Sequence, residues 1–530
     1  MTMRKIFLAV IFVMMTACFS SAGTSEIIYN LGIDPRTIDP ARNHALDGAQ
    51  VDVNIFDGLL RLNFSDKPEP ACAESWEVSD DGLTWTFHLR EGLKWSDGEK
   101  LTAQHFKDGF MRAADPETGA PYANLTHFIK NAKAFYDGKA KREDVGISVP
   151  DDRTLVIQLE YHNPLMLEYM AFQIFVPARM DVVNENPRGW AARPETLVCN
   201  GAFMLESWKH GDGGEIVLVK NPHYWDAENV KVDRLRFVLI NDSNTAYAAF
   251  RAGRIDYMSS VPNQMIPMLL KTGAVRAVPI LGTAFCGFNV TRKPLDDVRV
   301  RKALALAIDR KTITDKVLLA GQTPATGIIC GSIPGTTDAK DFRTEAGAFL
   351  PEHADADEAR RLLAEAGYPD GEGFPKISFK YPSSPTGKQF GEVLQGMWKQ
   401  VLGIEVELLN EEWKVFIETR QKLDYYMAWN GWIFDFADAA GMLETFISDS
   451  SLNDNGYKNY AFDDFMRKSA YEMDREKRIN YLHEAEKILM EDMPVAPVFF
   501  YSSIEMQSKR VRNIHKTAVG LVLFRNAEVM

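Results

Sequence analysis

The pattern of apolar residues changes near residues 283–289, and this change most constrains how the chain can fold. Before it, apolar and polar residues alternate in short segments between turn residues, which predicts β-strands over 84–90, 154–159 and 216–219. After it, segments of helical periodicity alternate with short apolar runs, which predicts helices over 298–308, 354–366 and 388–401 and strands over 377–381 and 404–409. Strands that alternate with helices predict a mixed or parallel sheet covered on both faces.

The last part of the chain, from about Val498, returns to strand character. A chain of 530 residues is too long for one ordinary core, so several domains are expected. If the chain begins and ends in the same domain, it crosses the boundary near 283–289 twice. Two crossings predict a two-part hinge and movement between two lobes.

Residues typical of helix ends support these predictions. Thr102 is expected to cap a helix that contains Phe106 and Phe110, and Asp296 or Asp297 to cap the helix that begins at 298. Gly403 is expected to end the helix over 388–401.

The first residues have the pattern of a bacterial export signal. Arg4 and Lys5 precede the apolar run 6–15, and small residues follow. Cleavage after Ala22 fits ordinary signal peptidase, whereas residues 15–18 resemble a lipoprotein box that ends in Cys18. We predict a signal peptide over 1–22 and a periplasmic protein, either free or anchored through a lipid on Cys18. No later segment has the roughly 18 to 20 uninterrupted apolar residues of a membrane span.

Four cysteines remain beyond Cys18: Cys72, Cys199, Cys286 and Cys330. In an oxidising compartment they allow two disulfides in any of three connectivities. The preferred pairs are Cys72 with Cys199 and Cys286 with Cys330. The alternative, given equal weight, is that all four are small buried side chains. The sequence contains no CxxC spacing, so a zinc ribbon is not expected.

Charge and motifs argue against nucleic-acid binding and catalysis. The formal net charge is −13 and no dense basic stripe occurs, so nucleic acid is not an expected partner. Gly387 and Lys388 resemble the end of a phosphate-binding loop, but Pro382 replaces its first glycine. His483 lacks the second histidine of a zinc protease, because position 487 is lysine. We predict no enzyme, metal or cofactor, and leave open a site assembled from distant segments.

The segment 411–438 is rich in aromatic residues around Asn430, Gly431 and Trp432 and contains an isolated carboxylate, Asp435. Aromatic faces accept groups of varied shape, whereas a carboxylate requires a cation. This combination suits the α-ammonium group of a peptide.

Four segments in order carry a family resemblance: TWTFHLREGLKWSDGEKLTAQHF from Thr84, NGAFMLESW from Asn200, FNVTRKPLDDVRVRKALALAIDR from Phe288 and EEWKVFIETR from Glu411. Together they resemble the periplasmic oligopeptide-binding proteins of ABC importers, extracellular solute-binding protein family 5. The resemblance extends from about Ile27 to the C-terminus.

The resemblance implies an α/β fold of the two-lobed periplasmic-binding-protein type, class II, with an additional third domain and mixed β-sheets flanked by helices. It implies domain I over 23–56, 179–283 and 503–530, domain II over 57–178, and domain III over 284–502. A peptide would be enclosed between the lobes and held mainly by main-chain hydrogen bonds, as an added strand.

The resemblance also implies a set of ligand-binding residues. Asp435 would pair with the peptide α-ammonium, and Gly431 and Ile433 would lie on the strand that pairs with the peptide backbone. The remaining predicted site residues are Trp413, Arg420, Tyr122, Trp429 and Trp432, with Ala45 and Leu46 on the opposing segment. Trp429 departs from the family pattern, because an arginine can occupy this position, and this leaves the preferred peptide length open.

Each assignment has a structural alternative. Asp435 could cap a following helix, since Asp438 and small residues come after it. Trp413 and Trp432 could be core aromatics. Arg420 could pair with a nearby acid, and Tyr122 could only anchor its loop.

The resemblance implies the solute-binding component of an ABC transporter, a monomer that delivers short peptides to permease subunits and their ATPases in the inner membrane. The alternatives are a carrier of another solute, such as a dipeptide, nickel chelate, haem or oligosaccharide, or an exported peptidase.

Overall fold

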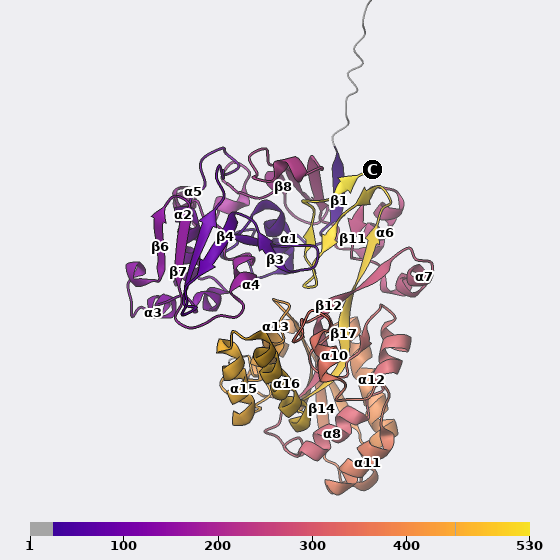
Figure 1. The fold of residues 1–530 in the computed structure, drawn as a ribbon. Coiled ribbons are helices and arrows are strands. Elements are labelled where there is room, and N and C mark those ends of the chain that lie inside the picture. The colour runs from indigo at the N-terminus through magenta and orange to yellow at the C-terminus, as the bar shows by residue number, and fades with distance from the viewer. Residues whose placement is uncertain (1–24, 451) are drawn as a thin grey trace, which may run out of the picture.

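The computed structural model describes residues 25–450 and 452–530, so the predicted signal peptide and Cys18 lie outside the described residues. The described chain forms two lobes joined by two long strands, β12 (Arg276–Phe288) and β17 (Val495–Gln507), as Figure 1 shows. Within this part of the chain, no helix is both long and apolar enough to cross a membrane. The predicted two-lobed α/β architecture is confirmed.

The lobe that contains the N-terminal described residues, here the upper lobe, has two sheets. The first continues from β17 in the order β11, β1, β10, β9, β8, with β1 parallel to β10 and β11. Its strands and helices are β1 (Glu26–Asn30), β8 (Phe203–Lys209), β9 (Glu215–Lys220), β10 (Arg234–Val238), β11 (Tyr257–Met258), α1 (Leu46–Ile55), α6 (Ser243–Arg251) and α7 (Ile266–Lys271).

The second sheet of the upper lobe is antiparallel, in the order β4, β5, β7, β6. Trp85, Phe87 and Leu89 of β5 are buried at alternate positions, as the period of two predicted. Its elements are β4 (Ala73–Val78), β5 (Thr84–Leu89), β6 (Ile147–Asp151), β7 (Thr154–Gln158) and α2 (Ala103–Ala114). Thr102 is the N-cap of α2, and its N–H donates to the His105 ring at 3.0 Å.

Short elements complete the upper lobe. They are β2 (Leu60–Leu62), β3 (Pro68–Pro70), α3 (Ala132–Tyr136), α4 (Met166–Met170), α5 (Met180–Glu185), β18 (Val511–Arg512), β19 (His515–Lys516), β20 (Val522–Leu523) and β21 (Glu528–Val529).

The lower lobe carries the predicted alternation of strands and helices. Its sheet has the order β15, β14, β16, β12, β17, with β14 parallel to β15 and β16, so the sheet is mixed. The Asp297 carboxylate accepts from the Arg299 N–H at the start of α8, and Gly403 ends α12 in the left-handed conformation at φ 69°.

The lower-lobe elements have the following bounds: α8 (Val298–Leu306), α9 (Arg310–Thr312), β13 (Thr323–Pro324), α10 (Phe342–Ala346), α11 (Ala356–Glu365), β14 (Ile377–Pro382), α12 (Pro385–Leu402), β15 (Val406–Glu411), α13 (Trp413–Gln421), β16 (Met427–Ile433), α14 (Ala440–Leu443), α15 (Tyr460–Tyr471) and α16 (Arg475–Asp492).

The antiparallel strands β12 and β17 form the connection between the lobes. Ala277 of β12 packs against an upper-lobe apolar cluster, whereas Leu281 belongs to the lower-lobe core. The ladder between the two strands shifts register between Pro279 and Thr283, so its regular hydrogen bonding is interrupted where the chain passes between the lobes. This interruption lies just before the boundary predicted at 283–289.

The preferred disulfide pairs are wrong. Cys72, Cys199, Cys286 and Cys330 are all buried free thiols. Cys72 Sγ lies 3.5 Å from the Asn200 amide nitrogen, whereas Cys199 Sγ lies 3.5 Å from the Phe203 carbonyl oxygen, so the two thiols contact different groups. Burial raises the pKa of Cys199 and of Cys330 to about 12, which keeps both protonated. The alternative, four small buried side chains, is confirmed.

A buried ion pair connects α2 with the loop between β1 and α1 in the upper lobe. The Arg112 guanidinium on α2 donates to both carboxylate oxygens of Asp39, at 2.6 and 2.5 Å, and Trp190 Nε1 donates to Asp39 at 3.1 Å. The two charged side chains are only 7% and 5% exposed.

Arg112→Met is expected to lower the free energy of unfolding of the upper lobe by about 3 to 5 kcal/mol, because it leaves the Asp39 charge buried without a cation. Urea titration followed by tryptophan fluorescence measures this. The matched control is Arg142→Met, whose exposed pair with Asp115 should contribute less than about 1 kcal/mol. Equal losses in the two variants would contradict the assignment.

Candidate functional site

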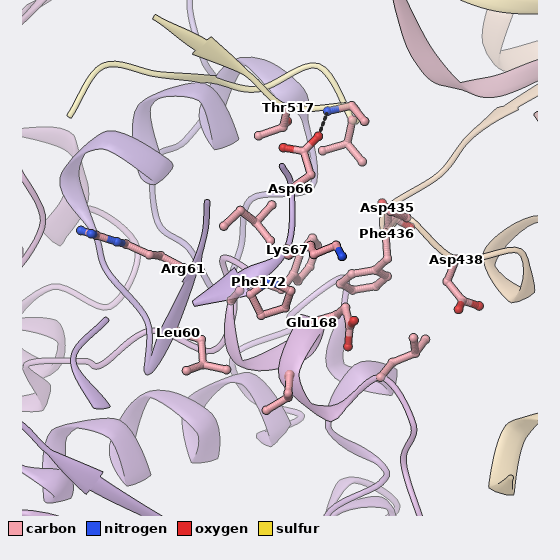
Figure 2. A pocket seen from close by; sticks show the side chains of 18 of the residues that line it. Leu60, Arg61, Asp66, Lys67, Glu168, Phe172, Asp435, Phe436, Asp438 and Thr517 are labelled. Atoms are coloured by element: carbon pink, nitrogen blue, oxygen red, sulfur yellow. Dashed lines mark hydrogen bonds between the residues drawn. The ribbon is translucent and has the colours of Figure 1, made fainter. Parts of the chain in front are cut away.

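A cavity of about 530 Å³ lies at the junction of the two lobes, and we call it the chamber (Figure 2). The upper lobe contributes residues from 60–68, from 164–176 and from the C-terminal segment 517–525. The lower lobe contributes residues 435–438 and part of 473–479 at the start of α16. The chamber is therefore assembled from segments that are far apart in the sequence.

Asp435 is one of the lower-lobe residues that line the chamber. The Tyr122 hydroxyl, from the upper lobe, donates to Asp435 Oδ1 at 3.2 Å, so two predicted site residues are brought together. Burial raises the pKa of Asp435, and the hydrogen bond from Tyr122 opposes this rise. The side chain is still exposed to solvent, which limits the rise. Within the described residues no lysine or arginine pairs with this carboxylate, so a ligand cation can.

Asp438, and not Asp435, serves the helix that follows. Asp438 Oδ1 accepts from the Ala440 N–H at 2.9 Å at the start of α14, and both Asp438 oxygens accept from the Arg478 guanidinium at 2.6 and 2.8 Å. The alternative interpretation of Asp435 as a capping residue is therefore wrong. The capping carboxylate has a cation of its own, whereas the Asp435 carboxylate accepts from Tyr122 of the upper lobe.

Two further carboxyl groups lie near this junction. Burial, reinforced by Asp438 and Asp435, raises the pKa of Glu444 to about 7. Burial also raises the pKa of Glu168, which lies beside the chamber with Phe172 (Figure 2). Carboxyl groups crowded in this way favour the arrival of a cation.

β16 presents a free edge beside Asp435. Residues 427–433 pair with β12, but β14 pairs only with Met427 and Ala428 of β16. Within the described chain, the side of residues 430–433 that faces away from β12 is therefore not covered by a strand. Such an edge is a template for an added strand.

The hydrogen bonds with β12 determine which residues of β16 face this edge. The Asn289 N–H donates to the Tyr426 carbonyl, and the Phe434 N–H donates to the Leu281 carbonyl, both at 2.9 Å. Hydrogen-bonded pairs recur every second residue in an antiparallel ladder, so residues 428, 430 and 432 also bond to β12. The backbone groups of Gly431 and Ile433 consequently point to the free edge, whereas those of Trp429 lie beside Lys380 of β14. Gly431 and Ile433 are the residues that the sequence predicted to pair with a ligand backbone.

Gly431 has two close neighbours at this edge. A Cβ atom at this position would lie 2.2 Å from the Tyr501 hydroxyl oxygen, so the absence of a side chain permits the close approach. The Gly431 N–H donates to its neighbour Asn430 Oδ1 at 2.8 Å. A ligand carbonyl that binds this N–H must replace the Asn430 side chain.

The other predicted residues lie outside the chamber lining. Arg420 donates to Asp454 at 2.8 Å, so its guanidinium already has a carboxylate partner within the lower lobe. Trp429 packs its ring 3.9 Å from that of Phe390, which makes it part of an aromatic cluster. Trp432 is half-buried, and Trp413 at the start of α13 is 57% exposed. Ala45 is the N-cap of α1, and Leu46 is 54% exposed.

The lobes already touch around the chamber. The Phe436 ring from the lower lobe lies 4.8 Å from Phe172 and 5.0 Å from Tyr169 of the upper lobe. Lys67 Nζ of the upper lobe lies 3.2 Å from Asp338 of the lower lobe, and Arg475 also donates to Asp338 at 2.9 Å. These contacts were not predicted from the sequence. Phe436 stands next to Asp435 and could have been included, but its partners have no local signal because they come from other domains.

Comparison with known proteins places the chain in a family. The model for bacterial extracellular solute-binding proteins, family 5 (middle region), matches residues 67–454. The oligopeptide-binding protein OppA of Bacillus subtilis is 33% identical over 515 residues, which cover 96% of this chain and 93% of that protein.

Two solved structures share the fold over nearly the whole chain. The periplasmic murein tripeptide-binding protein MppA in its unliganded open form has a TM-score of 0.81 and 31% identity, covering 96% of this chain and 98% of that one. Haemophilus influenzae OppA in complex with RPPGFSPFR has a TM-score of 0.76 and 31% identity, covering 96% and 99%. The chain therefore belongs to the bacterial extracellular solute-binding proteins of family 5.

Proposed function

We propose that the protein captures short peptides between its lobes and delivers them to an ABC importer. The observation that carries this proposal is the free edge of β16, which ends two residues before Asp435, a carboxylate that no lysine or arginine of residues 25–450 and 452–530 pairs with. The N–H and C=O groups of Gly431 and Ile433 bind a peptide main chain, and Asp435 binds its α-ammonium group. Main-chain bonding is independent of side chains, so the site accepts varied sequences.

The comparisons support a peptide ligand. Bacillus subtilis OppA is described as an oligopeptide-binding protein, and the Haemophilus influenzae structure contains a bound peptide. Closure of the two lobes about β12 and β17 would enclose the ligand, as in other hinged binding proteins. We assign domains I and II to the upper lobe and domain III, residues 284–502, to the lower lobe.

The cellular setting follows from the same proposal. The export pattern at residues 1–22 delivers the protein to the periplasm. There it acts as a monomer, either free or, if Cys18 is lipidated, anchored to a membrane. The loaded form docks on permease subunits of the inner membrane, whose ATPases drive import. A dipeptide, nickel chelate, haem or oligosaccharide carrier, and an exported peptidase, are the competing functions.

Native mass spectrometry of the purified protein separates these functions. A series of peptide masses supports the proposal, and a single non-peptide adduct contradicts it. Incubation with peptides tests the peptidase alternative, since cleavage products would indicate an enzyme.

Asp435→Asn is expected to weaken the binding of a free tetrapeptide about a hundredfold, because the α-ammonium loses its countercharge inside the closed cleft. Isothermal titration calorimetry measures the change. The control is Asp212→Asn, which removes an exposed carboxylate from a turn of the upper lobe and should leave affinity unchanged. Unchanged affinity in the Asp435 variant would remove this residue from the site.

Peptide affinity is expected to fall as the pH is lowered from about 7 to about 4, because the ammonium group binds the ionised carboxylate. An ordinary aspartate has a pKa of about 3.9. The pKa of Asp435 is raised, so this carboxylate takes up a proton at a higher pH. Titrations at several pH values should give a steep profile for the wild type and a shallower one for Asp435→Asn. Parallel profiles would contradict this role.

Ile433→Pro is expected to weaken peptide binding about tenfold, because proline removes the N–H that faces the free edge. The bonds between β16 and β12 should survive, since the Ile433 N–H does not face β12. Ile433→Ala keeps the N–H and is the matched control for loss of the side chain, which is 42% exposed. Equal effects of the two substitutions would argue against main-chain pairing at this position.

A further inference from the structure

The chamber extends beyond the position proposed for the peptide α-ammonium. Asp435 lies at its boundary, and the cavity of about 530 Å³ continues between the lobes past Phe436 and Phe172 (Figure 2). A site that only had to hold an ammonium group against a carboxylate would need no space of this size. Cavities of roughly 300 to 1,000 Å³ are typical of sites for whole small ligands.

Apolar side chains from both lobes form much of the chamber lining, and they include Leu62, Pro68, Leu165, Phe172, Phe436 and Val519. Because these side chains line a cavity, part of their apolar surface does not pack against other protein groups. A ligand group that displaces water from it gains free energy in proportion to the area covered.

Most charged groups around the chamber already have partners. Asp438 is bonded to Arg478, and Lys67 and Arg475 share Asp338. Arg61 pairs with Glu69 and Asp226. An uncharged group can therefore enter without leaving these charges unpaired.

The lobes are in contact at several points around the chamber. Phe172 and Phe436 lie 4.8 Å apart, Tyr122 bonds to Asp435 at 3.2 Å, and Lys67 lies 3.2 Å from Asp338. These contacts hold segments of both lobes around the cavity in this structure.

The course of the main chain connects the chamber with the free edge of β16. The free edge of β16 ends at Ile433, because the Phe434 N–H is bonded to Leu281. A peptide paired with this edge, with its first nitrogen at Asp435, places any group attached to that nitrogen at the chamber entrance.

We propose that the chamber receives an acyl group on the α-nitrogen, so that the protein binds N-acylated peptides as well as peptides with a free terminus. This inference rests on the proposed peptide-binding function and names a further class of ligand for the same site. The amide N–H of an acylated terminus donates to Asp435 in place of the ammonium group, and the acyl chain covers the apolar chamber lining.

Calorimetry with tetra-alanine and its N-acetyl and N-octanoyl derivatives tests this proposal. The octanoyl derivative is expected to bind at least tenfold more tightly than the acetyl one, since each buried methylene group contributes up to about fourfold in affinity. Asp435→Asn should weaken tetra-alanine at least tenfold more than it weakens the octanoyl derivative, because only the free terminus carries a charge.

Two substitutions fill the chamber from different segments: Ala171→Trp beside α4 and Val519→Trp in the C-terminal segment. Each is expected to weaken binding of the octanoyl derivative at least tenfold and to change tetra-alanine binding less than about threefold. Retained tetra-alanine binding shows that the variant is folded. Ala364→Trp, on the exposed face of α11, is the matched control and should change neither.

Three outcomes would overturn the inference while tetra-alanine still binds: equal affinity for the acetyl and octanoyl derivatives, equal loss of tetra-alanine and octanoyl binding in both chamber variants, or binding of free octanoate as tight as that of the octanoyl peptide. Failure of the wild-type protein to bind any of the three peptides would instead contradict the proposed function on which the inference rests.

Discussion

The pairing of β12 with β17 is the constraint on which the rest of the structure depends. These strands connect the upper and lower lobes, and their hydrogen bonds hold the two crossings of the chain side by side (Figure 1). The ladder is interrupted near Pro279, between residues that pack in different cores. The same strand β12 also pairs with β16, so one strand both joins the lobes and positions the edge proposed to face the ligand.

The electrostatics of the junction explain why Asp435 differs from the other aspartates near it. Asp438 has Arg478, Asp454 has Arg420, and Asp338 has both Lys67 and Arg475. Among the side chains that the structure describes, Asp435 has only the hydroxyl of Tyr122 as a partner. A neutral donor from the opposite lobe supports the carboxylate without neutralising it, which keeps its charge available for a ligand.

Main-chain pairing and the chamber would have complementary roles in ligand choice. An unpaired strand edge binds any peptide backbone, because N–H and C=O groups are the same in every residue. The size of the chamber, and the apolar residues that line it, would instead select what the first nitrogen carries. The strand edge would therefore tolerate varied peptide sequences, whereas the chamber would select the group on the peptide nitrogen.

Much of the local structure was predictable because it rests on local patterns. The alternation in residues 84–89, the Asp297 cap and the left-handed Gly403 follow from sequence periodicity and capping chemistry. The isolated Asp435 could be picked out from the residues alone, and family resemblance added Gly431 and Ile433, which lie on the β16 ladder. The disulfide prediction failed because spacing in the sequence carries no information on which way two thiols point.

The sequence by itself determined the two-lobed α/β class and the segment that contains the candidate site, since both depend on periodicity and on residues close together in the chain. Only the tertiary structure decided which charges are already paired, which backbone groups of β16 remain free, and that a chamber lies beyond Asp435. These features arise where residues near 66, 170, 435, 475 and 520 meet, and the order of residues along the chain does not specify such distances.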